Sequence, residues 1–142
     1  MKVIFAILAI VFSSTVFAQA DSSLEYKVAS IDAGKWIEKN DTSVERIRGL
    51  LSSAEKIYGL PQEKLADMAA RTKDIAKEKQ LAVTIAELLD WSLIACDVKC
   101  QDKEFAENMT AYVIVRTSSG QTHHQAIHSL AILQNAEKRL SK

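Results

Sequence analysis

Residues 42–75 have the sequence TSVERIRGLLSSAEKIYGLPQEKLADMAARTKDI, the most regular pattern in this chain of 142 residues. Apolar side chains recur in it at intervals of three and four, which places them on one face of an α-helix. In the first half, that face comprises Val44, Ile47, Leu51, Ala54 and Tyr58. We therefore predict a helix that buries this stripe and turns its charged side to water.

Gly59 and Pro61 separate this helix from a second one. Glycine commonly takes the left-handed conformation that ends a helix, and proline suits the first turn because its missing N–H would have no partner there. The second helix is expected to pair Asp67 with Arg71 on its outer side. Its predicted buried face is Leu65, Met68, Thr72 and Ile75. Together the two helices form a tight helical hairpin.

Three helix-start signals support an all-α fold. In a capping box, a hydroxyl accepts from the N–H three residues on, and the side chain at that third position reaches back. The matching pairs are Thr42 with Glu45, Thr84 with Glu87, and Thr122 with Gln125. The near-regular spacing of these pairs would fit a repeat of α-hairpins. The units share no sequence motif, however, so we interpret the chain as one compact bundle of five to six helices.

The remaining elements follow from the same apolar spacing. The helix after Thr84 is apolar on nearly its whole circumference, which favours a central position. The other expected elements are a loosely ordered segment at 21–30, a short helix at 32–40 bearing Trp36 and Ile37, a helix with Phe105, Met109, Tyr112 and Arg116 that stops near Gly120, and a last helix from Thr122 through Leu130 and Leu133 to Leu140. The β-branched run at 112–115 favours a strand locally, but its spacing favours the helix.

The first twenty residues have the order of a secretory signal peptide: Lys2, an apolar stretch, then small residues at Ala18 and Ala20. The apolar stretch is shorter than the roughly 20 residues that span a bilayer. We therefore predict cleavage before Asp21, with residues 1–20 as the leader and 21–142 as a single domain. The mature protein is expected in the periplasm or outside the cell, without stable membrane insertion.

The charge balance argues against nucleic-acid partners. The chain has 18 Lys and Arg against 18 Asp and Glu, and removal of Lys2 leaves 17 against 18, a net charge of about −1. Binding to nucleic acid needs a basic surface to neutralise phosphates.

Two cysteines, Cys96 and Cys100, are four residues apart in a chain predicted to enter an oxidising compartment, so a disulfide is the first hypothesis. A disulfide needs closer Cβ atoms than positions i and i+4 of a regular helix provide, so the helix must end or distort near Cys96. The alternatives are two free buried thiols, an intermolecular bond or a metal site. His124 and His128 would complete a set of two thiolates and two imidazoles suited to zinc.

The predicted binding site is the turn between the last two helices. Arg116 closes one helix, and His123 and His124 open the next. A helix start presents unpaired N–H groups and partial positive charge, so these three residues suggest a corner that binds an acidic group.

No catalytic, phosphate-binding or cofactor motif is present, so the sequence favours a binding protein over an enzyme and predicts neither catalytic residues nor a cofactor. The predicted function is non-covalent binding of a protein or a small anionic ligand in the cell envelope, as an inhibitor, immunity or chaperone-like factor. Two alternatives remain: a metal-binding protein that uses the Cys96, Cys100, His124 and His128 set, and an unrecognised envelope hydrolase. Homodimer formation also stays open.

Overall fold

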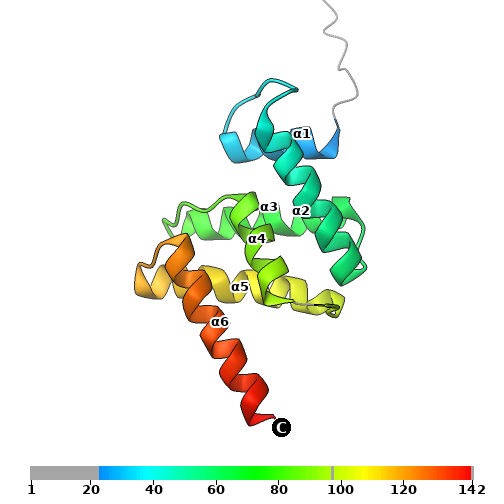
Figure 1. Ribbon diagram of the computed structural model, residues 1–142. Helices are drawn as coiled ribbons and strands as arrows, with labels where there is room; N and C mark the ends of the chain where they lie inside the picture. The colour runs from blue at the N-terminus through cyan, green and yellow to red at the C-terminus, as the bar shows by residue number, and fades with distance from the viewer. Residues whose placement is uncertain (1–22, 97, 142) are drawn as a thin grey trace, which may run out of the picture.

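A computed structural model describes residues 23–96 and 98–141, in which six α-helices and no strand are present (Figure 1). The helices are α1 (Leu24–Ala33), α2 (Thr42–Tyr58), α3 (Gln62–Glu78), α4 (Ile85–Ala95), α5 (Asp102–Ser119) and α6 (His123–Leu140). The predicted all-α class and helix number are confirmed. The predicted signal peptide and its cleavage site lie outside the described residues. No helix within those residues is both long and apolar enough to cross a membrane.

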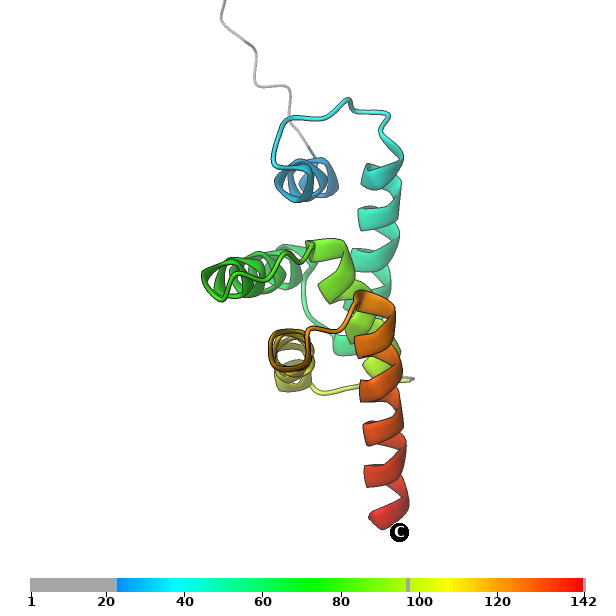
Figure 2. The same cartoon turned by 90° about the vertical axis from the view of Figure 1, so that its left-hand side faces the viewer.

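The bundle has two layers of helices. Figure 2 shows α1, α3 and α5 end-on, one below another, while α2, α4 and α6 run beside them. Successive helices thus form three stacked pairs, the arrangement of α-hairpin repeats. α4 packs against the five other described helices, which confirms its predicted central position.

The core is built from the predicted stripe of α2. All five of its residues, from Val44 to Tyr58, are buried, and Leu51 is fully so. Gly59 ends the helix with a positive φ of 67°, a conformation that costs glycine little because it has no Cβ. Pro61 immediately precedes α3, so the tight connection between these helices is confirmed.

Two of the three predicted capping boxes are confirmed, at Thr84 and at Thr122. The third is wrong, because α2 begins one residue earlier than its pattern implied. Asp41 occupies the cap position, and its carboxylate accepts a hydrogen bond from the N–H of Ser43 at 2.9 Å.

The predicted buried face of α3 is partly wrong. Leu65 is buried, but Met68 and Thr72 are only half-buried and Ile75 is 51% exposed. The other buried residues of α3 are Ala66, Ala69 and Ala76. Small side chains allow α3 to lie close to its neighbours, so the helix turns its alanine side inward and leaves Ile75 outside.

The N-terminal prediction is also wrong. The helix spans residues 24–33, with buried Val28 and Ala29, and Gly34 ends it with a φ of 66°. Trp36 and Ile37 lie in the loop that follows. Packing of α1 against α2 orders a segment that its position near the chain end had suggested to be loose.

The last two helices agree with the prediction in type but not in burial. The β-branched run at 112–115 is helical, because Tyr112 and Val113 pack into the core. On α6, however, Leu130 is the last buried residue, and Leu133 and Leu140 are exposed. The second half of α6 therefore projects beyond the other helices (Figure 2).

Candidate functional site

The predicted corner lies at the turn between α5 and α6, where Gly120 ends α5 with a positive φ. Arg116 and His123 both reach the hydroxyl of Tyr112, a fully buried residue of α5. The Nη1 of Arg116 donates to the Tyr112 oxygen at 2.6 Å, and Nδ1 of His123 lies 2.6 Å from the same oxygen. His124 is exposed beside them. The structure thus brings Arg116 and His123 together, but inside the helix junction.

Two carboxylates of α4 complete this cluster. The Nε2 of His123 is 3.2 Å from Oδ2 of Asp90, and Nη1 of Arg116 is 4.0 Å from Oε1 of Glu87. The side chain of Arg116 is only 12% exposed. Glu87 thus faces the guanidinium from within the protein, while the buried Nε of Arg116 has no hydrogen-bond partner among the described residues.

The distances form one chain of contacts across three helices. The imidazole of His123 lies between the carboxylate of Asp90 and the hydroxyl of Tyr112, and the Tyr112 oxygen accepts from Arg116. Burial raises the pKa of Tyr112 to about 12, although the hydrogen bond from Arg116 opposes the shift. A tyrosine that acts as base or nucleophile needs a pKa moved toward neutrality, so this arrangement suits a structural link between α4, α5 and α6.

The disulfide prediction is supported by geometry. The sulfur atoms of Cys96 and Cys100 lie at bonding distance, with Cα atoms 6.1 Å apart. α4 ends at Ala95, and Cys96 is extended, as closure of so short a ring requires. The N–H of Cys100 also donates to the carbonyl of Ile57 at 3.2 Å, which attaches this loop to the end of α2.

The four residues of the metal alternative do not assemble into a site. Cys96 and Cys100 bond to each other. Across residues 23–96 and 98–141, no three His, Cys, Asp or Glu side chains are grouped so that they could hold a metal ion.

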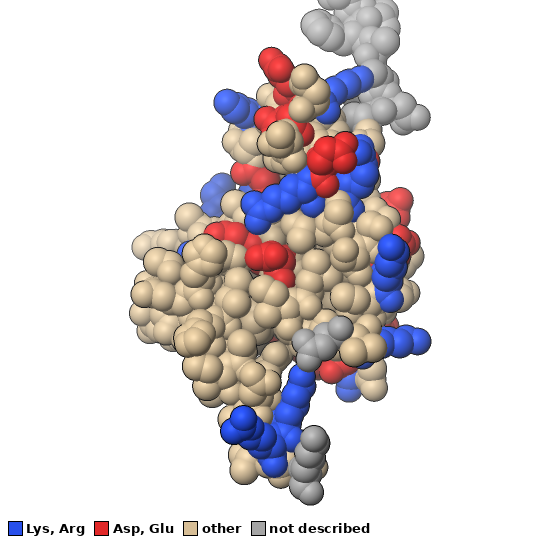
Figure 3. Space-filling view, in the orientation of Figure 1, with Lys and Arg blue, Asp and Glu red and all other residues tan. Residues whose placement is uncertain are grey.

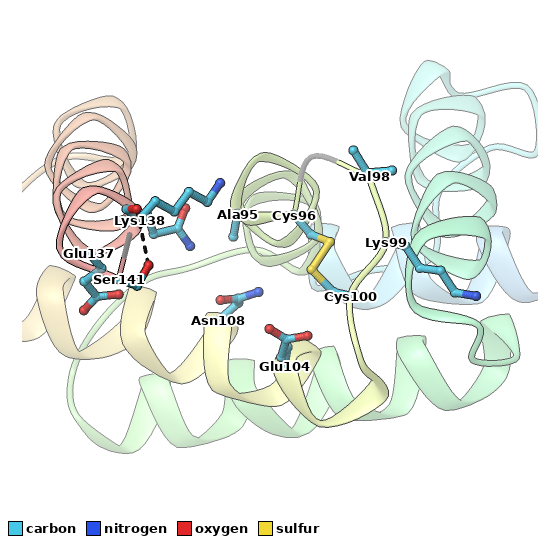
Figure 4. Close-up of a pocket in the computed structure, with 11 residues that line it drawn as sticks. Ala95, Cys96, Val98, Lys99, Cys100, Glu104, Asn108, Glu137, Lys138 and Ser141 are labelled. Atoms are coloured by element: carbon cyan, nitrogen blue, oxygen red, sulfur yellow. Dashed lines mark hydrogen bonds between the residues drawn. A yellow bond between two sulfur atoms is a disulfide. The ribbon is translucent and has the colours of Figure 1, made fainter.

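A cleft of about 530 Å³ lies beside the disulfide, between the end of α4, the first half of α5 and the second half of α6 (Figure 4). Two of its polar residues have structural roles. Glu104 accepts from the N–H of Gln101 at 2.5 Å and thereby caps α5, and Asn108 donates to the hydroxyl of Tyr58 at 3.1 Å. Glu137 of α6 points away from the disulfide (Figure 4).

A surface that the sequence reasoning missed covers α6 and the adjoining end of α5. From 109 to 136 the sequence has one residue with a formal charge, Arg116, and that residue is largely buried. Three large apolar side chains are more than half exposed here: Ile114, Ile132 and Leu133. We call the solvent-facing part of 109–136 the uncharged face. Figure 3 shows it as an area without charged side chains, with Lys and Arg gathered at the tip of α6.

A signal for this face was present in the sequence. A quarter of all residues are charged, so about seven would be expected in 28 residues, against the one observed. What the sequence could not show is that α5 and α6 display this segment together at one end of the molecule.

Comparison with known proteins adds no relative: no family model, no curated protein and no solved structure matches this chain.

Proposed function

We propose that this chain is an exported, non-catalytic protein-binding module whose partner docks on the uncharged face. The observation that carries the proposal is the absence of formal charge from the solvent-facing part of 109–136. The buried centres of protein–protein interfaces are depleted in charged residues, because each charge must lose its water. A surface that excludes charge and exposes Ile114, Ile132 and Leu133 matches that composition.

The position of the face in the fold supports the same function. α5 and α6 form the last of the three stacked pairs, so their outer side is the place where a further helical pair would pack. End units of stacked helical proteins carry a polar outer face to stay soluble. This end has exposed apolar residues instead. A partner that presents a helix or a helical hairpin therefore fits best, in an inhibitor, immunity or chaperone-like role.

The predicted corner takes a different part in this proposal. Arg116 and His123 stabilise the junction from within, through Tyr112 and the carboxylates of α4. The rigid turn they create presents His124 to solvent at the edge of the face. His124 is thus the corner residue available to a partner, as a hydrogen-bonding group. The disulfide is in keeping with an oxidising compartment, which supports export.

The test compares two isoleucines of nearly equal exposure. Ile132 on the uncharged face is 55% exposed, and Ile75 on α3 is 51% exposed. Ile132→Glu and Ile75→Glu each add one charge at a site where folding tolerates it. The experiment cross-links tagged mature protein in the envelope of its own cells and measures the amount of partner recovered with it. Ile132→Glu should reduce that amount by at least about tenfold. Ile75→Glu should retain that partner.

Equal recovery by both variants would contradict the proposal, as would loss caused by Ile75→Glu alone. Sedimentation of the purified protein tests whether the partner is a second copy of this chain. In that case the measured mass doubles as the protein concentration rises, and Ile132→Glu abolishes the doubling.

A further inference from the structure

Trp36 lies at the end of the molecule opposite the tip of α6, in the loop between α1 and α2 (Figure 1). Its side chain is 74% exposed, and one side of its ring stacks on Tyr26, with centroids 5.9 Å apart and an interplanar angle of 20°. The hydroxyl of Tyr26 donates to the carbonyl of Ile37 at 2.8 Å. The loop and the indole are therefore held in one orientation rather than swinging freely.

A pocket of about 530 Å³ opens next to this indole. Its lining residues are Lys27, Ser30, Ile31, Gly34, Lys35 and Trp36. Tyr26 is not among them, so the pocket lies on the part of Trp36 that Tyr26 leaves uncovered. The volume suits a small organic ligand.

The polar groups of the pocket point to a ligand with negative charge. Lys27 and Lys35 are exposed, and neither forms an ion pair with any residue that the structure describes. The charge of Lys35 does help to lower the pKa of the Asp41 carboxyl group. Ser30 is only 6% exposed, yet its Oγ has no hydrogen-bond partner among the described residues. Buried hydroxyl groups without a partner are rare because they lose their hydrogen bonds to water. The Oγ itself has almost no accessible surface, so the two lysines, and not Ser30, define the charge of the ligand.

We propose that this pocket binds a small aromatic anion, such as an aromatic carboxylate. The ligand ring stacks on the free side of Trp36 in the offset geometry that aromatic pairs prefer. Its acidic group is held between the ammonium groups of Lys27 and Lys35. The pocket is at the far end of the fold from the uncharged face, so this proposal does not depend on the proposed function.

The two tryptophans provide the readout. Trp91 is 1% exposed and Trp36 is 74% exposed, so their indole N–H signals in ¹H–¹⁵N spectra report a buried and a surface site. Titration with 2-naphthoate should shift the Trp36 signal in a saturable way and leave the Trp91 signal in place. Cyclohexanecarboxylate lacks the aromatic ring, 2-naphthylmethylamine has the opposite charge, and inorganic phosphate has charge alone. Each should bind at least about tenfold more weakly than 2-naphthoate.

Variants test the residue assignments by ligand-observed NMR. Trp36→Ala should weaken 2-naphthoate binding by at least about tenfold, and Lys35→Gln by about threefold. Lys39→Gln is the matched control, because Lys39 is an exposed lysine of the same loop that does not line the pocket. It should bind 2-naphthoate as the unchanged chain does.

Three results would overturn the proposal. One is full binding by Trp36→Ala, and another is equal binding of phosphate and 2-naphthoate. The third is no response to 2-naphthoate together with Trp36-dependent binding to phosphatidylglycerol vesicles, which would make this surface a membrane contact.

Discussion

The carboxylate of Asp32, near the end of α1, accepts a hydrogen bond at 2.6 Å from the backbone N–H of Ile85, the first residue of α4. Its second oxygen accepts from the N–H of Ala86 at 2.9 Å, and Lys73 of α3 donates to the first at 3.2 Å. The first N–H groups of a helix have no partner within the helix. Asp32 therefore caps the central helix from a distant part of the chain and joins α1, α3 and α4.

Replacing Asp32 with Ala should lower the free energy of unfolding by about 1–3 kcal/mol, because the change leaves two N–H groups of α4 and Lys73 without this partner. Urea denaturation followed by circular dichroism measures the effect. Asp67→Ala is the control, since its pair with Arg71 is exposed and should contribute less than about 1 kcal/mol. Equal losses of stability in the two variants would show that the Asp32 cap contributes no more than an exposed ion pair.

Leu51→Ala should destabilise the protein by roughly 2–5 kcal/mol, because Leu51 is fully buried in the stripe of α2 and its loss leaves a cavity. Lys56→Ala, on the exposed side of the same helix, should change stability by less than about 0.5 kcal/mol. A small effect at Leu51 would mean that the core is not where the structure places it.

Stability should fall in alkali because of Tyr112. Its pKa is raised by burial from about 10 to about 12, so the folded protein retains a proton that the unfolded chain releases. The contribution is complete below pH 10 and is lost as the pH rises through 12, by roughly 2 kcal/mol. Tyr58, whose pKa is also raised by burial, adds a loss of the same sign.

The variant Tyr112→Phe distinguishes the contribution of Tyr112 to the loss of stability in alkali from that of Tyr58. At pH 7 this variant should be less stable by about 1–3 kcal/mol, because Arg116 and His123 lose their shared partner. Between pH 10 and 12 the difference from the unchanged protein should shrink, since the variant has no proton to lose at this position. Denaturation curves at pH 7, 10 and 12 provide the comparison, and a constant difference would refute the role of Tyr112 ionisation.

Reduction of the Cys96–Cys100 bond should lower the melting temperature only modestly. The ring spans few residues, so the chain-entropy contribution is on the order of 2 kcal/mol. When exported protein is denatured without a reductant, thiol titration should detect no reactive cysteine. Two reactive thiols in such material would show that the bond does not form during export.

Mature protein from an export-competent cell should begin at Asp21, because Ala18 and Ala20 form the small-x-small site that signal peptidase accepts. Intact mass spectrometry decides the outcome. A chain that retains Met1 in the membrane fraction would favour an uncleaved anchor.

Local pattern was sufficient for much of the fold. The stripe of α2, its end at Gly59 and the capping boxes at Thr84 and Thr122 were predicted correctly, because each depends on residues within one or two turns. The spacing of Cys96 and Cys100 likewise predicted that the helix must end or distort there, and α4 ends at Ala95. The first helix and the buried side of α3 were not predictable in this way. The side of a helix that turns inward depends on the helices around it, and here they admit Ala69 and exclude Ile75.

The candidate sites divide along the same line. The sequence by itself determined which residues meet at the α5–α6 turn, since Arg116 and His123 are separated only by a short connection. Only the tertiary structure decided that they face inward, because α4 places Asp90 and Glu87 against them. The missing charges of 109–136 were visible in the sequence, but stacking of the helical pairs turns that segment into one exposed face. The physical reason is that spacing along the chain specifies which side chains share a helix face, whereas burial is decided by contacts between helices far apart in sequence.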